Sequence, residues 1–196
     1  MIDKRYFYER GREFKLFGKL NQNQVSSIDY IINHFEFLKI KDLRWLAYML
    51  ATVKHETANT YLPIEEFGSG KGRRYGKKVK HNGVAYTKPN KIYYGRGYVQ
   101  LTWFENYELM GRLLQIPLLE QPELALDVDM ATKIMFEGMT RGASSLGDFT
   151  GRSLEQYFNP KTDDPIGARK IINGTDKAEL IASYHKLFLK CLNANP

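Results

Sequence analysis

Cysteine and long apolar runs are almost absent from this sequence of 196 residues. The one cysteine is Cys191, so no intramolecular disulfide can form, and packing must hold the chain together around a buried thiol. The first twenty residues, MIDKRYFYERGREFKLFGKL, carry charges throughout and contain no apolar run long enough for a signal peptide or a membrane span. We therefore expect synthesis in the cytoplasm, no stable membrane anchoring, and export only with outside help.

Motifs that bind metals or nucleotides are missing as well. His55-Glu56 could begin a zinc-protease motif, but that motif needs a second histidine where this chain has Asn59. The remaining histidines show no ligand spacing. The segment 95–97, Gly-Arg-Gly, lacks the third glycine of a dinucleotide fingerprint and the lysine of a phosphate loop. We expect neither a metal nor a nucleotide cofactor.

Acidic residues are absent from residues 67–91, which contain eight lysines and arginines. The whole chain has a net charge of +7, which favours a polyanionic partner: nucleic acid, an anionic membrane surface or a cell-wall polymer. Tyr75 and Tyr86 interleave with the basic residues, as in some nucleic-acid binders, but no nucleic-acid motif accompanies them, so we expect no nucleic-acid partner. Short hairpin strands are possible around Val79 and 84–87, with Asn82-Gly83 as the turn.

What is present is mainly helical periodicity. Apolar residues recur at helical spacing in five segments, namely 21–35, 41–57, 103–114, 128–142 and 176–192. Capping-box spacing begins the first of them at Asn21 and the last at Asp176, and Gly142 is a plausible end for the fourth. The chain has no internal repeat and no linker, so the pattern predicts one unit of mainly α (α+β) class.

The second of these helices ends at His55 and Glu56. On a helical wheel Glu56 lies at the flank of the apolar stripe, whereas His55 points away from it. A carboxyl held beside apolar side chains is partly desolvated, which favours the protonated form that a general acid needs; a solvated glutamate at a helix end is the alternative. Glu65 and Glu66 follow. An acid that faces a second carboxylate over a groove is what glycoside hydrolysis requires, although spacing alone is weak evidence.

Residues 93–107, YYGRGYVQLTWFENY, form a motif that can be compared with known families. With HET at 55–57, it resembles the hallmark of the family 19 glycoside hydrolases, the chitinase group within the lysozyme-like superfamily. Eleven positions match in register: Tyr93, Tyr94, Gly95, Arg96, Gly97, Gln100, Leu101, Thr102, Trp103, Asn106 and Tyr107. A weaker likeness covers most of the chain and is closest to the compact phage and prophage endolysins. The resemblance implies a lysozyme-like, two-lobed helical fold with a small β-hairpin region beside the cleft, in one catalytic domain over residues 1–196 without a separate wall-binding module.

Catalytic roles are also implied by this resemblance. It makes Glu56 the general acid and Glu66 the general base, with Glu65 as the alternative base. Thr102 would help the base to orient the attacking water. The mechanism is single displacement with inversion, for which the two carboxyl groups stand roughly 6.5 to 9.5 Å apart.

Substrate contacts are implied at six further positions, which are His55, Tyr94, Gln100, Asn106, Arg169 and Asn173. Gln100 and Asn106 would bind sugar hydroxyl and N-acetyl groups, and Arg169 would neutralise or position a catalytic carboxylate. The aromatic residues of the motif could instead be plain core residues, and Arg96 could be a structural ion-pair partner.

The expected substrate follows from departures from the family pattern and from the net charge. Tyr98 and Val99 stand where many chitinases carry Pro-Ile, and the cysteine framework of the plant enzymes is missing. Together with the basic charge, these departures favour a monomeric, lysozyme-like or muramidase-like endolysin that cleaves peptidoglycan and waits in the host cytoplasm before its release to the cell wall. The alternatives are a chitinase acting on GlcNAc polymers and a non-catalytic glycan-binding protein.

Overall fold

The computed structural model describes residues 1–140 and 149–194, and its described part is mainly helical, as the sequence predicts. The α-helices are α1 (Lys4–Glu13), α2 (Gln22–Phe37), α3 (Leu43–Glu56), α4 (Phe104–Leu114), α5 (Val128–Met139), α6 (Leu154–Tyr157) and α7 (Ala178–Leu192). Short 3₁₀ helices are η1 (Tyr75–Lys77), η2 (Pro122–Leu126) and η3 (Gly167–Ile171). The strands are β1 (Ile64–Glu65), β2 (Arg96–Gly97), β3 (Phe158–Asn159) and β4 (Thr162–Asp163).

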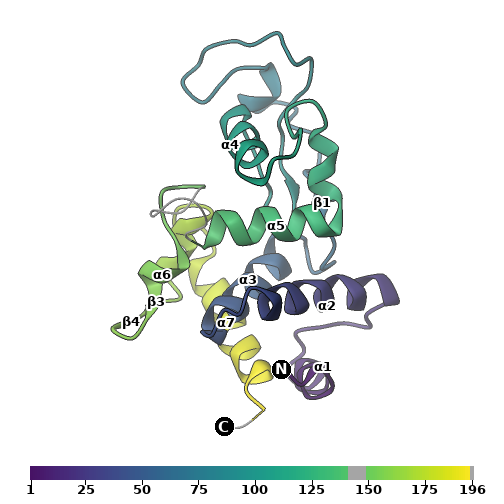
Figure 1. Cartoon of the computed structure of the whole chain (residues 1–196), viewed down its shortest axis with the longest axis vertical. Helices are drawn as coiled ribbons and strands as arrows, with labels where there is room; N and C mark the ends of the chain where they lie inside the picture. The colour runs from purple at the N-terminus through teal and green to yellow at the C-terminus, as the bar shows by residue number, and fades with distance from the viewer. Residues whose placement is uncertain (141–148, 195–196) are drawn as a thin grey trace.

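These elements form two lobes along the long axis of the molecule (Figure 1). The lower lobe contains α1, α2, α3 and α7, and α6 with the β3–β4 hairpin lies at its side. The upper lobe contains α4, the β1–β2 pair and, at its tip, the loop segment 67–91, and α5 crosses between the two lobes. None of the described helices combines the length and apolarity that crossing a bilayer demands.

Helix α3 is the central element of the core, because every residue from Leu46 to Lys54 is buried. Its apolar surface packs against α7, whose buried residues include Phe188 and Cys191. Asp42 caps its N-terminus by accepting a hydrogen bond from the backbone N–H of Arg44 at 3.0 Å. The buried Cys191 confirms the core position that the apolar pattern predicts.

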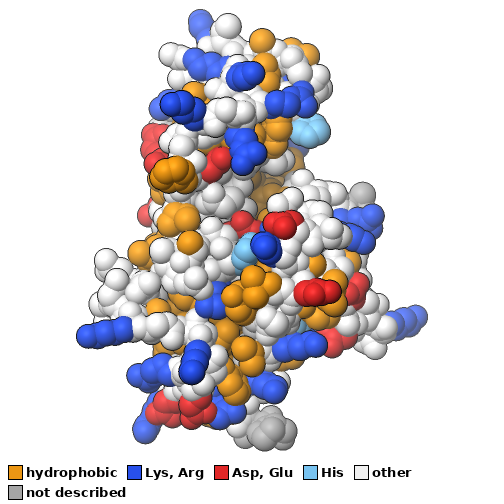
Figure 2. All heavy atoms as spheres, turned by 180° about the vertical axis from the view of Figure 1, so that it is seen from behind, with side chains coloured by type: hydrophobic (Ala, Val, Ile, Leu, Met, Phe, Trp, Pro, Cys, Tyr) orange, Lys and Arg blue, Asp and Glu red, His pale blue; other side chains and the backbone are white. Residues whose placement is uncertain are grey.

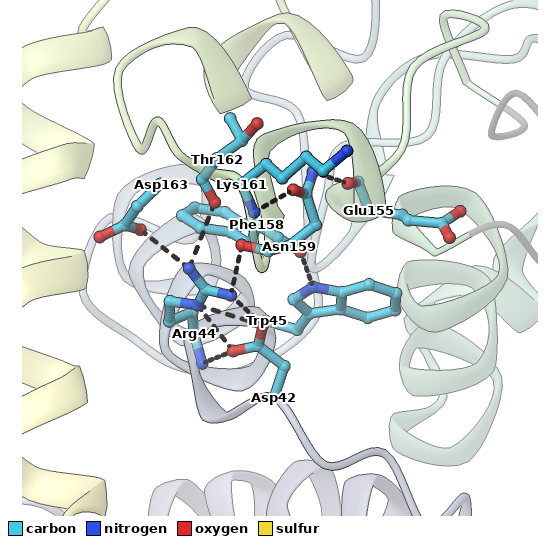
Figure 3. A network of polar contacts seen from close by, with 9 residues as sticks. All are labelled: Asp42, Arg44, Trp45, Glu155, Phe158, Asn159, Lys161, Thr162 and Asp163. Carbon is cyan, nitrogen blue, oxygen red and sulfur yellow. Dashed lines mark hydrogen bonds and ion pairs between the residues drawn. The ribbon is translucent and has the colours of Figure 1, made fainter.

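A polar network fixes the first turn of α3 to the β3–β4 hairpin (Figure 3). The guanidinium group of Arg44 donates to the carbonyl oxygens of Asn159 and Thr162, both at 3.2 Å, and its Nη1 lies 3.7 Å from Asp163. Trp45 donates from Nε1 to the carbonyl oxygen of Phe158 at 3.0 Å. Helix α3 is thus held at the end opposite to Glu56, which limits how far Glu56 can shift.

Some helix boundaries differ from those predicted. The capping box at Asn21 is present, with Gln24 as the reciprocal partner, but the one predicted at Asp176 is wrong. Helix α7 starts two residues later, at Ala178, and its N-cap is Lys177 in the left-handed conformation with φ +58°. The backbone carbonyl of Asp176 instead accepts a hydrogen bond from Arg169. Gly142, the predicted end of the fourth helix, lies outside the described residues.

The hairpin predicted around Val79 and 84–87, in the basic segment of residues 67–91, is reduced to an isolated bridge between Val79 and Ala85. Lys80 donates its backbone N–H to the carbonyl of Val84 at 2.8 Å, and Gly83 donates to the carbonyl of Lys80 at 2.8 Å. Gly83 has φ +88°, which a glycine adopts without strain. The turn is present, but the glycines and basic residues around it leave little strand to pair.

A buried histidine on α7 makes the stability of the fold pH-dependent. His185 is 2% exposed, and its ring stacks on that of Phe158 at 5.0 Å. Burial lowers the pKa of His185 to about 4, although the charges of Asp163 and Asp42 and a hydrogen bond with the backbone of Arg44 oppose the shift. The unfolded chain binds a proton here near pH 6.5.

We expect the stabilisation from neutral His185 to be fully present above pH about 6.5 and to be lost as the pH falls towards about 4, by up to about 3 kcal/mol. Urea unfolding of the wild-type chain and of His185→Leu at several pH values between 4 and 7 would measure it. The difference in unfolding free energy between the two proteins should change over this range. A constant difference would contradict the prediction.

Candidate active site

Glu56 lies at the end of α3 and pairs with Arg169, from η3, across 113 positions of sequence. Nη1 of Arg169 donates to Oε1 of Glu56 at 2.6 Å. The Arg169 side chain is 3% exposed and that of Glu56 is 15% exposed, so the pair is largely shielded from solvent. A second hydrogen bond, from Nε of Arg169 to the carbonyl of Asp176 at 2.8 Å, fixes the guanidinium plane. The carboxyl group of Glu56 is therefore held in one direction.

A cavity of about 350 Å³ opens beside Glu56. Five of the residues predicted to act in catalysis or to contact substrate lie along it, namely Glu56, Gln100, Thr102, Asn106 and Asn173. The remaining described lining residues are Tyr75, Val99, Leu101, Trp103, Phe149, Thr150 and Ile172. Carboxyl, amide and hydroxyl groups thus converge on a space with aromatic and aliphatic walls, which is typical of a ligand site.

The passage from β2 to α4 forms one wall of this cavity through an irregular backbone. Gln100 has φ +55° and Trp103 has φ +78°, conformations that cost energy in residues other than glycine and cluster at functional sites. Gln100 donates from Nε2 to the carbonyl of Ile64 at 3.1 Å, which fixes its side chain to β1. Thr102 donates from Oγ1 to the carbonyl of Gln100 at 2.7 Å, and Asn106 donates from Nδ2 to the carbonyl of Thr102 at 2.9 Å. These bonds orient the polar side chains.

Glu66 is held by two donors from the upper lobe. The hydroxyl of Tyr75 donates to Oε1 at 2.6 Å, and the backbone N–H of Gly95 donates to Oε2 at 3.0 Å. Both donors lie next to the cavity. Tyr75 lines it, and Gly95 packs closely against Gln100, another lining residue: a Cβ added to Gly95 would lie 2.7 Å from Oε1 of Gln100. Glu66 itself is half-buried and is not among the lining residues.

Glu65 has different surroundings from Glu66. It pairs with Arg96 in the β1–β2 ladder, and neighbouring residues of a strand point to opposite faces. Its carboxylate, 48% exposed, accepts a hydrogen bond from the hydroxyl of Tyr94 at 2.7 Å and lies 3.6 Å from Nε of Arg96. Of the two candidate bases, Glu66 is therefore the one joined to the cavity through its partners.

Three of the six positions predicted to contact substrate are absent from the described lining residues of this cavity, namely His55, Tyr94 and Arg169. Arg169 meets the cavity through Glu56. His55 is half-buried on the last turn of α3. Tyr94 holds Glu65 and lies under the guanidinium of Arg96, whose Cζ is 3.5 Å from the ring centroid. The contacts of His55 and Tyr94 with substrate stay a prediction.

The motif also contains plain structural residues. Tyr93 and Tyr107 are fully buried, and the 6% exposed Arg96 donates to the hydroxyl of Tyr107 at 3.0 Å. The structural alternative considered for these residues fits their positions. Trp103, in contrast, lines the cavity. Its ring meets that of Tyr75 edge-on at 5.4 Å.

Sequence reasoning missed four lining residues: Tyr75, Phe149, Thr150 and Ile172. Tyr75 stands out because it contacts Glu66 and lines the cavity. Its only sequence signal was its place among basic residues, which pointed to nucleic acid. Thr150 and Ile172 carry no motif, and only the folded chain brings them to the cleft.

A second cavity adjoins the first. It shares six lining residues with it, namely Trp103, Asn106, Phe149, Thr150, Ile172 and Asn173, and adds His81, Asn82, Glu105 and Gly174. Glu105 fixes the near edge of the basic segment, because its Oε1 accepts the backbone N–H of His81 at 2.8 Å. The two cavities form one groove that runs from Glu56 to His81. Within residues 1–140 and 149–194, no three His, Cys, Asp or Glu side chains cluster in a way that could hold a metal ion.

Curated relatives share part of the sequence, whereas no family model matches the chain. An endochitinase of Arabidopsis thaliana is 37% identical over 81 residues, which cover 41% of this chain and 26% of the relative. The basic endochitinase CHB4 of Brassica napus is 42% identical over 82 residues, which cover 41% of this chain and 29% of the relative. The match thus spans less than a third of the length of these relatives.

Solved structures are similar over nearly the whole chain. Chitinase C from Streptomyces griseus has a TM-score of 0.58 at 20% identity, covering 98% of this chain and 76% of that one. A class IV chitinase of family 19 from Zea mays has a TM-score of 0.57 at 20% identity, covering 91% and 84%. This is the fold of the family 19 chitinases. The chitinase-like fold confirms the resemblance that residues 93–107 indicate, and it confirms the lysozyme-like, mainly helical class.

Proposed function

We propose that this chitinase-like chain is a glycoside hydrolase that cleaves β-1,4 bonds in GlcNAc-containing polysaccharides by acid/base catalysis with inversion. One observation carries the proposal: Glu56, fixed by Arg169, opens onto a polar cavity whose wall also contains Tyr75, the partner of Glu66. Two carboxyl groups from different lobes, one at a groove and one joined to it through Tyr75, supply the acid and the base that glycoside hydrolysis needs.

In this mechanism Glu56 donates a proton to the oxygen of the leaving sugar. The leaving group needs this proton because an alkoxide is a poor leaving group. Arg169 holds the carboxyl group in position and then pairs with the carboxylate that proton donation leaves behind. Nearly complete burial of Arg169 keeps this contact from being replaced by water.

Glu66 acts as the base that takes a proton from the attacking water. The hydrogen bonds from Tyr75 and Gly95 orient its carboxylate. Thr102 donates a hydrogen bond from its hydroxyl group to the carbonyl of Gln100. The oxygen of that hydroxyl group can therefore accept a hydrogen bond from the attacking water. A water held between Glu66 and Thr102 attacks one face of the sugar while Glu56 protonates the leaving group.

The substrate class has two candidates. The first candidate is a neutral GlcNAc polymer such as chitin, because the similar curated proteins are named as endochitinases. These relatives support chitin better than peptidoglycan, which the sequence alone favours. Peptidoglycan is kept as the second candidate because the chain has a net charge of +7 and that wall polymer carries carboxylates. If peptidoglycan is the substrate, the proposed role is that of an endolysin that is retained in the host cytoplasm until its release to the cell wall.

Digestion of chitooligosaccharides and of purified peptidoglycan tests the proposal. We expect cleavage of at least one of them, with products that appear first as the α-anomer in a proton NMR time course, because single displacement inverts the β-linkage. Mass spectrometry of the new reducing ends then identifies the sugar on the cleaved side. Binding without cleavage of either polymer would leave the non-catalytic glycan-binding alternative, and an initial β-anomer would contradict the inverting mechanism.

A further inference from the structure

The net positive charge of the chain comes from one segment. Residues 67–91, called the basic segment here, contain eight of the 29 lysines and arginines and none of the 22 aspartates and glutamates. The rest of the chain therefore has 21 basic and 22 acidic residues and is close to neutral. The basic residues are Lys71, Arg73, Arg74, Lys77, Lys78, Lys80, Lys88 and Lys91.

Most of this charge is free to meet a ligand. Five of the eight side chains belong to exposed residues, those at positions 71, 73, 74, 77 and 88. In the described part of the structure, only Lys91 of the eight has a carboxylate partner, Glu123 at 3.8 Å. Lysine and arginine side chains accordingly gather at the upper end of the molecule (Figure 2), which is the end that the basic segment forms.

The basic segment also borders the groove directly. Its Tyr75 lines the cavity of Glu56, and its His81 and Asn82 line the adjoining cavity. Two contacts pin it to the wall of the groove: the ring of His81 lies 5.0 Å from that of Trp103, and its backbone N–H is bound by Glu105. A glycan strand that fills the groove as far as His81 thus has its substituents within reach of free lysines and arginines.

We propose that the basic segment is a binding surface for the carboxylates of an anionic glycan, those carried by the lactyl-peptide groups of peptidoglycan, and that it adds affinity for such strands beyond the affinity of the groove for neutral GlcNAc polymers. This inference rests on the proposed function and concerns its second substrate candidate. Charge complementarity supports it, because a concentrated positive field beside a cleft raises the local concentration of an anionic polymer. The surface adjoins a groove with amide and hydroxyl groups suited to sugars, which favours a glycan over a nucleic acid.

A binding assay tests this without relying on turnover. All proteins carry Glu56→Gln, so that the polymer is not consumed. One variant adds Lys71→Gln, Lys77→Gln and Lys88→Gln. The matched control adds Lys19→Gln, Lys161→Gln and Lys186→Gln, which are also exposed and remove the same charge. Circular dichroism checks that each is folded, and co-sedimentation with purified peptidoglycan, with the same material after conversion of its carboxylates to methylamides, and with chitin gives the Kd values.

At 0.15 M salt we expect the basic-segment variant to bind peptidoglycan about tenfold more weakly than its parent. The control should stay within about twofold, because charges more than about 8 Å from the ligand are screened. The two variants should bind methylamidated peptidoglycan and chitin equally well. An equal loss of peptidoglycan binding in both variants, or the same loss of binding to chitin, would overturn the proposal; so would unchanged binding of the basic-segment variant to peptidoglycan. The proposed function is tested separately, by the cleavage of chitooligosaccharides and peptidoglycan with the wild-type protein, which retains Glu56.

Discussion

Replacing Glu56 by glutamine is expected to lower kcat by roughly a hundredfold to ten-thousandfold on any polysaccharide that the chain cleaves. The amide has nearly the shape of the carboxyl group but no proton to give to the leaving oxygen. KM should change little, because the amide fills the same place in the cavity wall. Release of reducing sugar at saturating substrate measures the effect.

The fold should survive this substitution at some cost. Arg169 keeps its bond to the carbonyl of Asp176 and can still donate to the oxygen of the amide, so we expect a loss of about 1 to 3 kcal/mol in unfolding free energy. Glu179→Gln, an exposed change on the first turn of α7, is the control and should keep full activity. A folded Glu56→Gln protein with near-normal turnover would remove Glu56 from the role of acid.

Glu66→Gln should cause the second large loss, again roughly a hundredfold to ten-thousandfold in kcat, because the attacking water then has no base. Glu65→Gln should cost less than about tenfold, since Glu65 is 48% exposed and tied to Arg96 and Tyr94 on the other face of β1. The two variants form a matched test, because the residues are neighbours that undergo the same substitution and differ mainly in the direction in which their side chains point.

The pH profile separates a base from a structural residue. In kcat/KM, the low-pH limb reports the deprotonation of the base. It should flatten in Glu66→Gln and persist in Glu65→Gln. If Glu66→Gln is as active as the wild type and Glu65→Gln is not, the role passes to Glu65.

The sequence was informative where a short motif and a periodic pattern coincide. The helix that ends at Glu56 and the passage through Gln100 and Thr102 were both expected, because apolar spacing and a dense polar motif are local properties. Arg169 was expected beside a catalytic carboxylate only through the family resemblance, and its partner is Glu56.

What the sequence did not reveal depends on long-range contacts. Tyr75 reaches Glu66 because the glycine-rich segment 67–91 brings it to the wall of the cavity, and no periodicity encodes that path. The start of α7 was misplaced because Asp176 looks like a helix cap, whereas its carbonyl is used by Arg169. In both cases tertiary bonds override a local preference.

The bond between Glu56 and Arg169 has a consequence for the newly made polypeptide. During synthesis the acid emerges 113 residues before the arginine that orients it. A ribosome-bound or prematurely terminated product that stops short of Arg169 therefore lacks the group that orients the carboxyl group of Glu56. Closing so long a loop comes late in folding as well, since distant contacts form after local helices. The cell that makes this protein would hold no partially made form in which Glu56 is paired with Arg169.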